Sequence, residues 1–557
     1  MKKIDQMTKE ELVSEVKNLR SRKKYGLVWE NKPEKVVDDC TKKLPVLIED
    51  TKKNISADKS SEINNLIIEG DNYHSLSVLN YTHKGKVDVI YIDPPYNTGN
   101  TSWVYNNKYV DSNDQWRHSN WLSFMKSRLQ LSRDLLTDDG YIVATIDDYE
   151  LFSLGLLMDD VFGEQNRAGV IVVENNPRGR TSNRFFATSH EYYLLYAKDV
   201  SKARLYNLPL TEDQKQVFKY EDAISKYRKR PLRKSGASSR RKDRPKQFFS
   251  IYINPKTLKA STEKSKGCIQ ILPIDNTGQE RVWINGIDTF RKFAEDGTLI
   301  VEESKKGYSL FVKDRIKAGR KPRSVWVSPK YDTASHGANL LLKMFGSKVF
   351  DYPKSVWAVK DFLYSLIGDK PNATVLDYFA GSGTTGHALL ELIKEDSIPR
   401  RFIVCTNDES NIANDVTYPR IKKVIEGYAD IQGIPANLKY FKTDFVDKQK
   451  VSDDTRRNLV VRATEMICVK ENTFEKKYDN KKFKIYTNKN SSTGILYELD
   501  AIDEFKQMLE KIGLKTSIYV FSLTHEKFTS DFSSLTVKYK LTPIPESILE
   551  VYRKLFG

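Results

Sequence analysis

Two short apolar runs constrain the fold of this chain more than any other feature. Val87–Ile92 and Tyr141–Ile146 contain almost no polar side chains. Short runs without polar alternation are typical of strands in a parallel sheet that is covered on both faces. Apolar residues at helical spacing around them, in Tyr73–Tyr81, Trp121–Leu136 and Glu150–Phe162, predict the covering helices. The sequence therefore predicts an α/β domain with a largely parallel sheet.

The alternation of predicted strands and helices is interrupted once and then resumes. It stops near residue 205, where basic runs, turns and short strands such as Phe248–Ile253 and Leu299–Glu302 take over. It returns with a strand at Ala373–Leu376, a helix at Thr385–Ile393 and a strand at Arg401–Cys405. The predicted parts are a helical arm over 1–60, an α/β half over 61–204, an inserted domain over 205–330, a second α/β half over 331–434, and an α+β segment over 435–557.

Cysteine usage and hydropathy exclude several classes of protein. The chain has four cysteines, far apart and without a CxxC pair. Neither a disulfide framework nor a cysteine-rich zinc site is expected, and no bound metal is predicted. No window approaches the roughly 18 uninterrupted apolar residues of a membrane helix. Because the first residues also lack the apolar run of a secretory signal, we expect a protein of a reducing cytoplasm.

Positive charge is concentrated in the inserted part. The chain carries 91 Lys and Arg against 74 Asp and Glu, a net charge of +17. Residues 226–246 alone hold 11 Lys or Arg against one Asp, which leaves +10. Such a cluster favours nucleic acid, because neutralising phosphates releases counterions. The predicted nucleic-acid contacts are Lys229, Arg230, Arg233, Lys234, Arg240, Arg241, Lys242 and Arg244.

A rigid polar motif follows the first apolar run directly. Asp93-Pro94-Pro95-Tyr96 begins where Val87–Ile92 ends, and ligands of open α/β sheets bind beyond the carboxyl ends of the strands. The two prolines lock φ and remove backbone donors, so their carbonyl groups stay free to accept hydrogen bonds. A turn that merely ends the strand would explain the prolines, but not the acid before them and the tyrosine after them. The motif predicts a fixed acceptor site for a ligand.

A glycine-rich turn follows the first strand of the second half. Residues 375–386 read VLDYFAGSGTTG, in which Gly381, Gly383 and Gly386 match GxGxxG. Glycines allow a ligand to approach the backbone closely, and the following helix offers unpaired N–H groups. A dinucleotide site is one alternative, but Asp377 would repel a pyrophosphate and would instead hold an ammonium group. No lysine follows the last glycine, so the turn is not a Walker A loop.

Together the two motifs resemble the S-adenosylmethionine-dependent amino-methyltransferases of DNA. Their order, with DPPY first, a large insertion next and DYFAGSGTTGHAL last, is similar to the β class of these enzymes. Shorter matches at the expected spacing are Gly70-Asp71, Asn120-Trp121 through Arg128-Leu129, Ile146-Asp147, His190-Glu191-Tyr192 with Tyr196 and Lys198, and Phe350 to Lys354. The C-terminal Ile544-Pro545-Glu546 and Tyr552-Arg553 are similar to modification (Mod) subunits of type III restriction–modification systems. The resemblance implies a Rossmann-like methyltransferase sheet with permuted motif order, an inserted target-recognition domain and a C-terminal α+β segment.

The resemblance also implies residue roles for methyl transfer to adenine N6 in double-stranded DNA. Asp93 and the Pro94 carbonyl would accept the two N–H bonds of the target amine, and Tyr96 would stack on the extruded base. The implied cofactor-binding residues are Asp377 for the methionine ammonium group, Phe379, Gly381 and Gly383 along the loop, and Lys354, Asp71, Asn407 and Glu409 as lesser candidates. Asn407 and Glu409 are alternatives for the residue that binds ribose. Capping or surface pairing is an equal interpretation of each lesser candidate.

Other functions stay open at the level of the sequence. Cytosine N4 would present an amine to the same acceptors, although Asp93 fits adenine enzymes better than the serine common in cytosine-N4 enzymes. A catalytically decayed DNA-recognition module and a nucleotide-dependent oxidoreductase built on GxGxxG are further alternatives. The resemblance implies a prokaryotic cytoplasm, a homodimer and a separate restriction subunit that would cleave DNA, since this chain has no nuclease or helicase signature.

Overall fold

The computed structural model describes most of the chain. The described residues are 8–9, 12–13, 27, 29–98, 104–105, 108–109, 116–179, 185–304, 307–447, 453–523 and 528–556. They fall into two compact units, of which one is Asn207–Lys321 and the other is the rest of the chain. Residues 1–7, 10–11, 14–26 and 28 of the predicted N-terminal arm lie outside the described residues.

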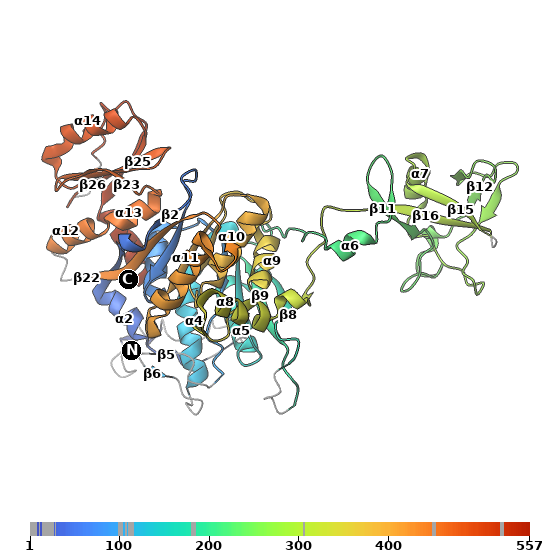
Figure 1. The fold of residues 1–557 in the computed structure, drawn as a ribbon, viewed down its shortest axis with the longest axis horizontal. Coiled ribbons are helices and arrows are strands. Elements are labelled where there is room, and N and C mark those ends of the chain that lie inside the picture. The colour runs from blue at the N-terminus through green and yellow to red at the C-terminus, as the bar shows by residue number, and fades with distance from the viewer. Residues whose placement is uncertain are drawn as a thin grey trace. The chain divides into compact units, whose positions relative to one another are not determined.

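A large mixed sheet organises the first unit (Figure 1). Its strand order is β1 (Lys43–Glu49), β22 (Asn437–Asp447), β3 (Asn64–Glu69), β19 (Arg401–Thr406), β18 (Thr374–Asp377), β4 (Val87–Ile92), β7 (Leu136–Ile146), β9 (His190–Ala197), β8 (Arg167–Glu174) and β17 (Val325–Trp326), and β2 (Ile55–Ser56) pairs with β22. The strands from β22 to β7 run parallel, whereas β9 is antiparallel to both of its neighbours. The α/β prediction is confirmed, with the correction that the sheet is mixed: β1 pairs antiparallel with β22 at one end, and β9 is antiparallel to its neighbours near the other.

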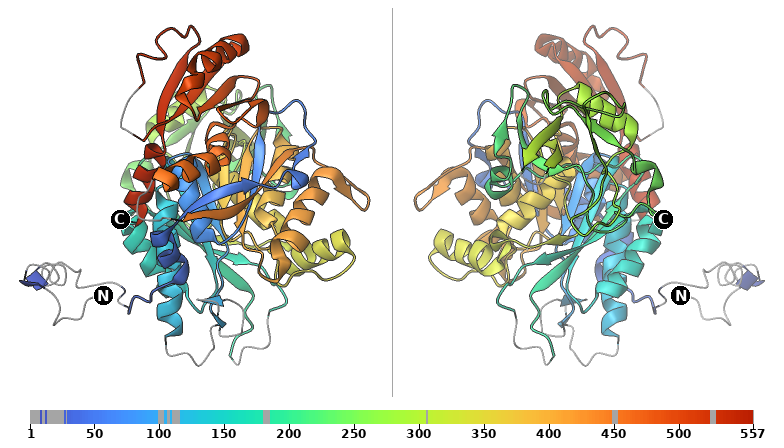
Figure 2. Two further views of the ribbon diagram at one scale, coloured as in Figure 1. Left: turned by 90° about the vertical axis from the view of Figure 1, so that its left-hand side faces the viewer. Right: turned by 90° about the vertical axis from the view of Figure 1, so that its right-hand side faces the viewer.

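Helices cover both faces of this sheet (Figure 2). One face carries α3 (Asn72–Thr82), α4 (Arg117–Arg133) and α5 (Leu151–Phe162), and the other carries α9 (Val356–Ile367), α10 (Thr384–Asp396) and α11 (Tyr418–Glu426). All residues of β4 and β18 are buried. The double cover explains why these central strands are largely apolar instead of alternating.

The two strands that precede the motifs are neighbours in the sheet, although they lie far apart in the chain. β18 pairs in parallel with β4, with Val375 opposite Val89 and Leu376 opposite Ile90. On one side of this pair the sheet continues through β19, and on the other through β7. Ligands of open α/β sheets bind at such a reversal of strand order, beyond the carboxyl ends of the strands. The permuted motif order therefore still brings both motifs to one edge of the sheet.

Three strands change the part boundaries that the sequence predicts. β1 lies within the predicted arm, and β22 lies beyond residue 434, yet the two pair with each other in the large sheet. β17 lies inside the predicted insertion 205–330 but pairs with β8, and the second unit accordingly ends at Lys321. These strands sit at or near the ends of the sheet and are defined by pairing between distant segments, which local residue patterns do not encode.

The C-terminal part adds a smaller sheet to the first unit (Figure 2). Its order is β23 (Glu475–Asp479), β24 (Phe483–Thr487), β25 (Ser491–Leu496), β26 (Lys515–Phe521) and β27 (Tyr539–Ile544). α14 (Ile502–Ile512) covers one face through Phe505 and Leu509. Tyr486 and Tyr519 belong to the same core as α13 (Thr464–Glu471) and α15 (Glu546–Phe556). This core is continuous with that of the large sheet.

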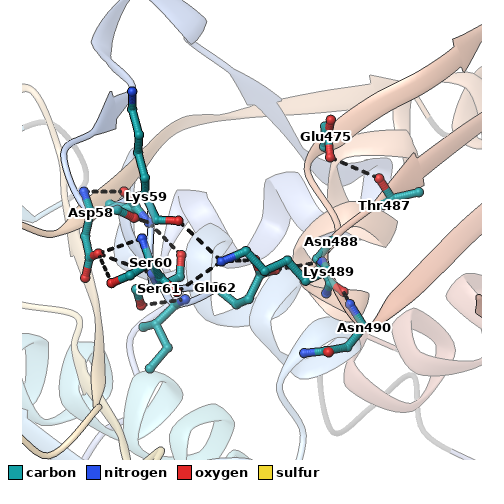
Figure 3. Close-up of polar contacts among 12 residues, drawn as sticks. Asp58, Lys59, Ser60, Ser61, Glu62, Glu475, Thr487, Asn488, Lys489 and Asn490 are labelled. Carbon is teal, nitrogen blue, oxygen red and sulfur yellow. Dashed lines mark hydrogen bonds and ion pairs between the residues drawn. The ribbon is translucent and has the colours of Figure 1, made fainter.

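A polar latch connects the smaller sheet to the loop before β3 (Figure 3). Lys489 Nζ donates to the carbonyl oxygens of Lys59 at 3.3 Å and Ser60 at 3.1 Å, and lies 3.5 Å from Glu62 Oε1. The Lys489 N–H donates to Glu62 Oε2 at 3.0 Å, and Asn488 accepts two N–H bonds within the same turn. Because the Lys489 side chain is 57% exposed, the latch orients the turn more than it stabilises the fold.

The second unit contains two small antiparallel sheets. The first is β10 (Tyr220–Glu221), β11 (Lys226–Pro231), β16 (Gly307–Arg315) and β15 (Leu299–Ser304), and the second is β13 (Ala260–Ser261), β12 (Ile251–Ile253) and β14 (Ile269–Ile271). Its helices are α6 (Glu212–Gln216) and α7 (Ile287–Glu295). Trp283, Phe290 and Leu310 lie in one core that joins both sheets to α7. The unit therefore has a hydrophobic core of its own.

The remaining elements of the first unit are short. They are α2 (Lys35–Lys42), β5 (Val104–Tyr105), β6 (Lys108–Tyr109), α8 (Asn339–Phe345), β20 (Gly427–Tyr428), β21 (Ile431–Gln432) and α12 (Asp453–Arg462). Across the described ranges, none of the helices has the length and apolar character that would let it span a membrane.

Candidate active site

Asp93 stands at the carboxyl end of β4, and the residues that the structure describes bind one of its two carboxylate oxygens. Oδ1 accepts a hydrogen bond from the Thr145 hydroxyl at 2.5 Å and lies 3.1 Å from Lys354 Nζ. Thr145 belongs to β7, so the neighbouring strand helps to fix the carboxylate. Within the described residues nothing donates to Oδ2, and the side chain is 30% exposed. The carboxylate thus retains one free acceptor atom.

The two prolines that follow differ in how the protein uses their carbonyl groups. Trp121 Nε1 of α4 donates to the Pro95 carbonyl at 2.7 Å. The Pro94 carbonyl receives no hydrogen bond from the part of the chain that the structure describes. Asn97, at φ 55°, ends the loop in the left-handed region, and its amide donates to the buried Glu150 at 2.5 Å. The loop is therefore anchored after Pro94 while the Pro94 carbonyl stays available.

A buried ion-pair network joins the motif to β9 and to the loop before α9. Glu191, near the start of β9, accepts hydrogen bonds from the Tyr96 hydroxyl at 3.0 Å and from Lys354 Nζ at 2.5 Å. Lys354 Nζ also donates to the Tyr96 hydroxyl. Burial alone would lower the pKa of Lys354, but the Asp93 and Glu191 carboxylates outweigh burial and raise this pKa above its ordinary value. Lys354 is therefore an ammonium group at neutral pH.

Asp377 ends β18 and is buried without a cation beside it. Its side chain accepts the Phe379 N–H at 2.9 Å and the Thr385 hydroxyl at 2.5 Å, and the residue is 3% exposed. None of the described lysines, arginines or histidines forms an ion pair with it. Burial raises the pKa of Asp377 to about 7, and the negative charge of Asp93 adds to the rise. A buried carboxylate with these properties is suited to bind the positive charge of a ligand.

Glycine is required at Gly381, Gly383 and Gly386 for different structural reasons. Gly381 and Gly383 have φ values of 48° and 80°, which side-chain-bearing residues rarely adopt. A Cβ at Gly386 would lie 2.8 Å from Ile421 Cδ1, so this glycine lets α10 pack closely against α11. The match to GxGxxG is therefore explained by turn geometry and helix packing.

Side chains at the start of α11 hold the glycine loop in place. The Thr417 hydroxyl donates to the Gly381 carbonyl at 2.6 Å. The guanidinium group of the buried Arg420 donates to the Ser382 and Thr384 hydroxyls, both at 2.8 Å. The loop is consequently shaped before any ligand binds.

Asp71 and Phe379 lie beside the loop in structural positions. Asp71 is the N-cap of α3 and accepts the Tyr73 N–H at 2.7 Å, and one of its oxygens lies 3.4 Å from Arg128. The Phe379 ring packs against Phe124, with 5.8 Å between the ring centroids. The structure thus gives Asp71 a capping role, and a role of either residue toward a cofactor stays a prediction.

The other lesser candidates lie in two different places. Asn407 and Glu409 are exposed beyond the carboxyl end of β19, and they contact each other in a hydrogen bond of 3.4 Å. Asp408 between them binds the backbone and side chain of Asn414. Lys354 contacts Asp93, because the loop before α9 reaches the end of β4, and a role of Lys354 toward a cofactor stays a prediction.

Three side chains outside the DPPY motif hold its loop. Thr145, Glu191 and Trp121 all make contacts there; Trp121 and Glu191 belong to the shorter matches in the sequence, but none of the three is assigned a chemical role there. Two of them interrupt apolar strands: Thr145 lies within Tyr141–Ile146, and Glu191 within His190–Ala197. Since buried polar groups need hydrogen-bond partners, such an interruption is a sequence signal that points to a site.

The basic side chains of the second unit divide into paired and unpaired groups. Lys229 forms an ion pair with Glu302, and Arg241 one with Glu280 at 3.0 Å. Arg233 donates to a backbone carbonyl. Besides Arg233, the predicted contacts that have no acidic partner among residues 207–304 and 307–321 are Arg230, Lys234, Arg240, Lys242 and Arg244. Unpaired charges are the better candidates for phosphate contacts, because paired ones are already neutralised.

Comparison with known proteins identifies the family of this chain. The chain matches the DNA methylase family over residues 87–414, a span that contains both Asp93 and Asp377. The chain belongs to the DNA methylase family. This DNA methylase is 37% identical over 389 residues to the type II methyltransferase M.KpnI of Klebsiella pneumoniae, which covers 68% of this chain and 88% of M.KpnI. The resemblance inferred from the motifs is confirmed: the protein is a DNA methyltransferase of the kind found in restriction–modification systems.

Type III Mod subunits are also related to this DNA methylase. The EcoPI Mod subunit of Escherichia phage P1 is 32% identical over 422 residues, covering 70% of this chain and 64% of the subunit. The StyLTI Mod subunit of Salmonella typhimurium is 30% identical over 401 residues, covering 67% and 57%. The chain therefore spans less than two thirds of each of these Mod subunits.

Two solved structures resemble this chain at low sequence identity. The M1.HpyAVI–SAM complex is 14% identical, with a TM-score of 0.29, over 64% of this chain and 97% of that one. The cytosine-N4-specific PvuII DNA methyltransferase is 13% identical, with a TM-score of 0.29, over 65% and 91%.

Proposed function

We propose that this DNA methylase transfers a methyl group from S-adenosylmethionine to adenine N6 in double-stranded DNA, as the modification and recognition subunit of a restriction–modification system. The observation that carries the proposal is the pair of free acceptors at the end of β4, Asp93 Oδ2 and the Pro94 carbonyl, beside the buried Asp377 at the end of β18. Aspartate rather than serine at the first position of DPPY favours adenine. Cytosine N4 is the alternative target.

The residues of the glycine loop fit S-adenosylmethionine. The buried Asp377 lacks a cation and would bind the methionine ammonium group, and the left-handed Gly381 and Gly383 allow close approach to the backbone. When bound, the cofactor supplies a methyl group on a sulfonium and leaves with the carbon–sulfur electron pair as S-adenosylhomocysteine. Asp377 thereby orients the donor relative to the end of β4.

The protein must free the lone pair of the target nitrogen, which in adenine is delocalised into the ring. Asp93 Oδ2 and the Pro94 carbonyl each accept one hydrogen bond from the amine, which favours a tetrahedral nitrogen with an available lone pair. After methyl transfer the nitrogen is positively charged and must lose one proton, which Asp93 Oδ2 is placed to accept. Catalysis is therefore alignment and proton acceptance without a covalent enzyme intermediate.

The unpaired basic side chains of the second unit are proposed to contact DNA phosphates. Combined replacement of Arg240, Lys242 and Arg244 by alanine should weaken binding to every duplex sequence and lower the salt slope of log K by up to about 3. Fluorescence anisotropy over a salt series measures both effects. The matched control, Lys229→Ala with Arg241→Ala, removes side chains that acids already neutralise and should change the slope much less. Equal losses in the two variants would contradict the assignment.

The relation to the EcoPI and StyLTI Mod subunits supports a separate restriction subunit as a partner. We place its contact, or that of a second copy of this chain, on the C-terminal segment 453–556, which forms a sheet of its own. Light scattering of the protein alone and with a candidate restriction subunit tests this placement.

Expression in a host that lacks DNA methylation, followed by genome sequencing with detection of modified bases, tests the proposed function. N6-methyladenine at one recurring sequence is the expected result, and marking of one strand only would favour a type III system. N4-methylcytosine would establish the alternative target. An unmodified genome, despite a folded protein that binds duplex DNA, would instead support a DNA-recognition module without catalysis.

A further inference from the structure

Lys354 lies at the centre of a buried cluster that includes the carboxylate of Asp93. Its ammonium group has three N–H donors, and the structure provides three acceptors: Asp93 Oδ1 at 3.1 Å, Glu191 Oε2 at 2.5 Å and the Tyr96 hydroxyl. Lys354 is 8% exposed and Glu191 is 2% exposed. Every donor of the ammonium group is therefore engaged inside the site.

This cluster determines which oxygen of Asp93 can receive a substrate. Oδ1 is bound both by Thr145 from β7 and by Lys354 from the loop before α9. With these two donors on Oδ1, only Oδ2 is left for the target amine, and two anchors on one oxygen restrict rotation of the carboxylate. We propose that Lys354 and Glu191 are positioning residues that hold the Asp93 carboxylate with Oδ2 aimed at the amine. The inference rests on the proposed methyl transfer and replaces the cofactor role of Lys354.

Charge balance explains why both residues are needed. Asp93 and Glu191 carry two negative charges and Lys354 carries one positive charge, so the cluster presents a net charge of −1 to the amine. Without the ammonium group, two carboxylates that had shared one lysine would face each other, and such pairs share a proton. A protonated Asp93 would donate instead of accept. The other titratable groups around Asp93 are Tyr91, Tyr96, Tyr193 and Asp377.

The test is the pH profile of methyl transfer in charge-altered variants. Lys354→Met should lower the rate at neutral pH by roughly 10- to 100-fold and move the acid limb of the profile to higher pH. Adding Glu191→Gln restores the net charge of −1 and should return the acid limb toward that of the wild type. S-adenosylmethionine affinity, measured by calorimetry, should not change in either variant. Lys330→Met removes a lysine paired with Asp361 outside the cluster and should leave the profile unchanged.

The outcomes separate this inference from the proposed function. A lower rate of Lys354→Met with an unshifted acid limb would show that the cluster is only a structural ion pair, and would overturn the inference. A loss of S-adenosylmethionine affinity that accounts for the lost rate would also overturn it. A wild-type protein that methylates neither adenine nor cytosine would instead reject the proposed function. Where Lys354→Met fails to fold, Lys354→Arg decides: it retains the charge and should keep the wild-type acid limb, and a shifted limb would count against the charge argument.

Discussion

Alanine at position 93 is expected to lower the rate of methyl transfer by roughly 10²- to 10⁴-fold while S-adenosylmethionine affinity stays within about twofold of the wild type. The variant loses the acceptor for the target amine and for its departing proton. Asp377 and the glycine loop belong to the neighbouring strand β18 and keep their own hydrogen bonds. Transfer of tritium from labelled cofactor to duplex DNA measures the rate, and calorimetry measures the affinity.

The fold should survive this change, because Lys354 keeps Glu191 and Tyr96 as partners and no buried charge is left unpaired. Asp134→Ala is the matched control, since it removes an exposed carboxylate that pairs with Lys84 away from the site. This control should retain full activity. Near-normal turnover by Asp93→Ala would refute the role assigned to Asp93.

Cofactor binding is expected to weaken below pH 7 through Asp377. Burial raises the pKa of this side chain to about 7, so the free protein takes up a proton there as the pH falls through this value. Only the ionised carboxylate can pair with the methionine ammonium group. The affinity for S-adenosylmethionine should therefore fall by up to about tenfold for each pH unit below 7. Calorimetry over a pH series measures this dependence.

Asp377→Asn separates the charge from the shape of the side chain. The amide can still accept the Phe379 N–H, but affinity at neutral pH should fall by roughly 10²-fold and lose most of its pH dependence. Stability should respond in the opposite sense. Because the folded-state pKa of Asp377 is raised, its contribution to the stability of the wild type is lost as pH rises from 3.8 to about 7.

Thermal unfolding without cofactor checks this second effect. The Asp377→Asn protein should gain stability relative to the wild type above neutral pH, where the wild-type side chain is ionised and buried. Wild-type affinity together with wild-type pH dependence in this variant would show that the cofactor ammonium group binds elsewhere.

Local residue patterns located the central elements well and the outer ones less well. Val87–Ile92 is a strand with the predicted bounds. The strand predicted at Tyr141–Ile146 begins at Leu136, because Leu136 pairs with Val87 across an irregularity in the ladder. The strand predicted at Phe248–Ile253 begins only at Ile251, where its pairing with Ile271 of β14 starts. Hydropathy follows burial, whereas the ends of a strand follow pairing with a partner elsewhere in the chain.

The same difference applies to Lys354. Its place just before the cofactor motif in the sequence suggested a cofactor ligand. In the folded chain the loop before α9 brings its ammonium group to Asp93 and Glu191, whose positions in the sequence are remote. The position of a lysine in the sequence does not predict which carboxylate its long side chain reaches in the folded chain.

The sequence alone determined the chemical groups of the candidate site in this DNA methylase: an acid and two proline carbonyls after one buried strand, and an acid with a glycine-rich turn after another. Each set is encoded within a few consecutive residues, so a local pattern suffices to read it. Only the tertiary structure decided that β4 and β18 lie side by side, that Oδ1 of Asp93 is taken by Thr145 and Lys354, and that Oδ2 is left free. Those features depend on contacts between segments far apart in the chain, and such contacts exist only once the sheet has formed.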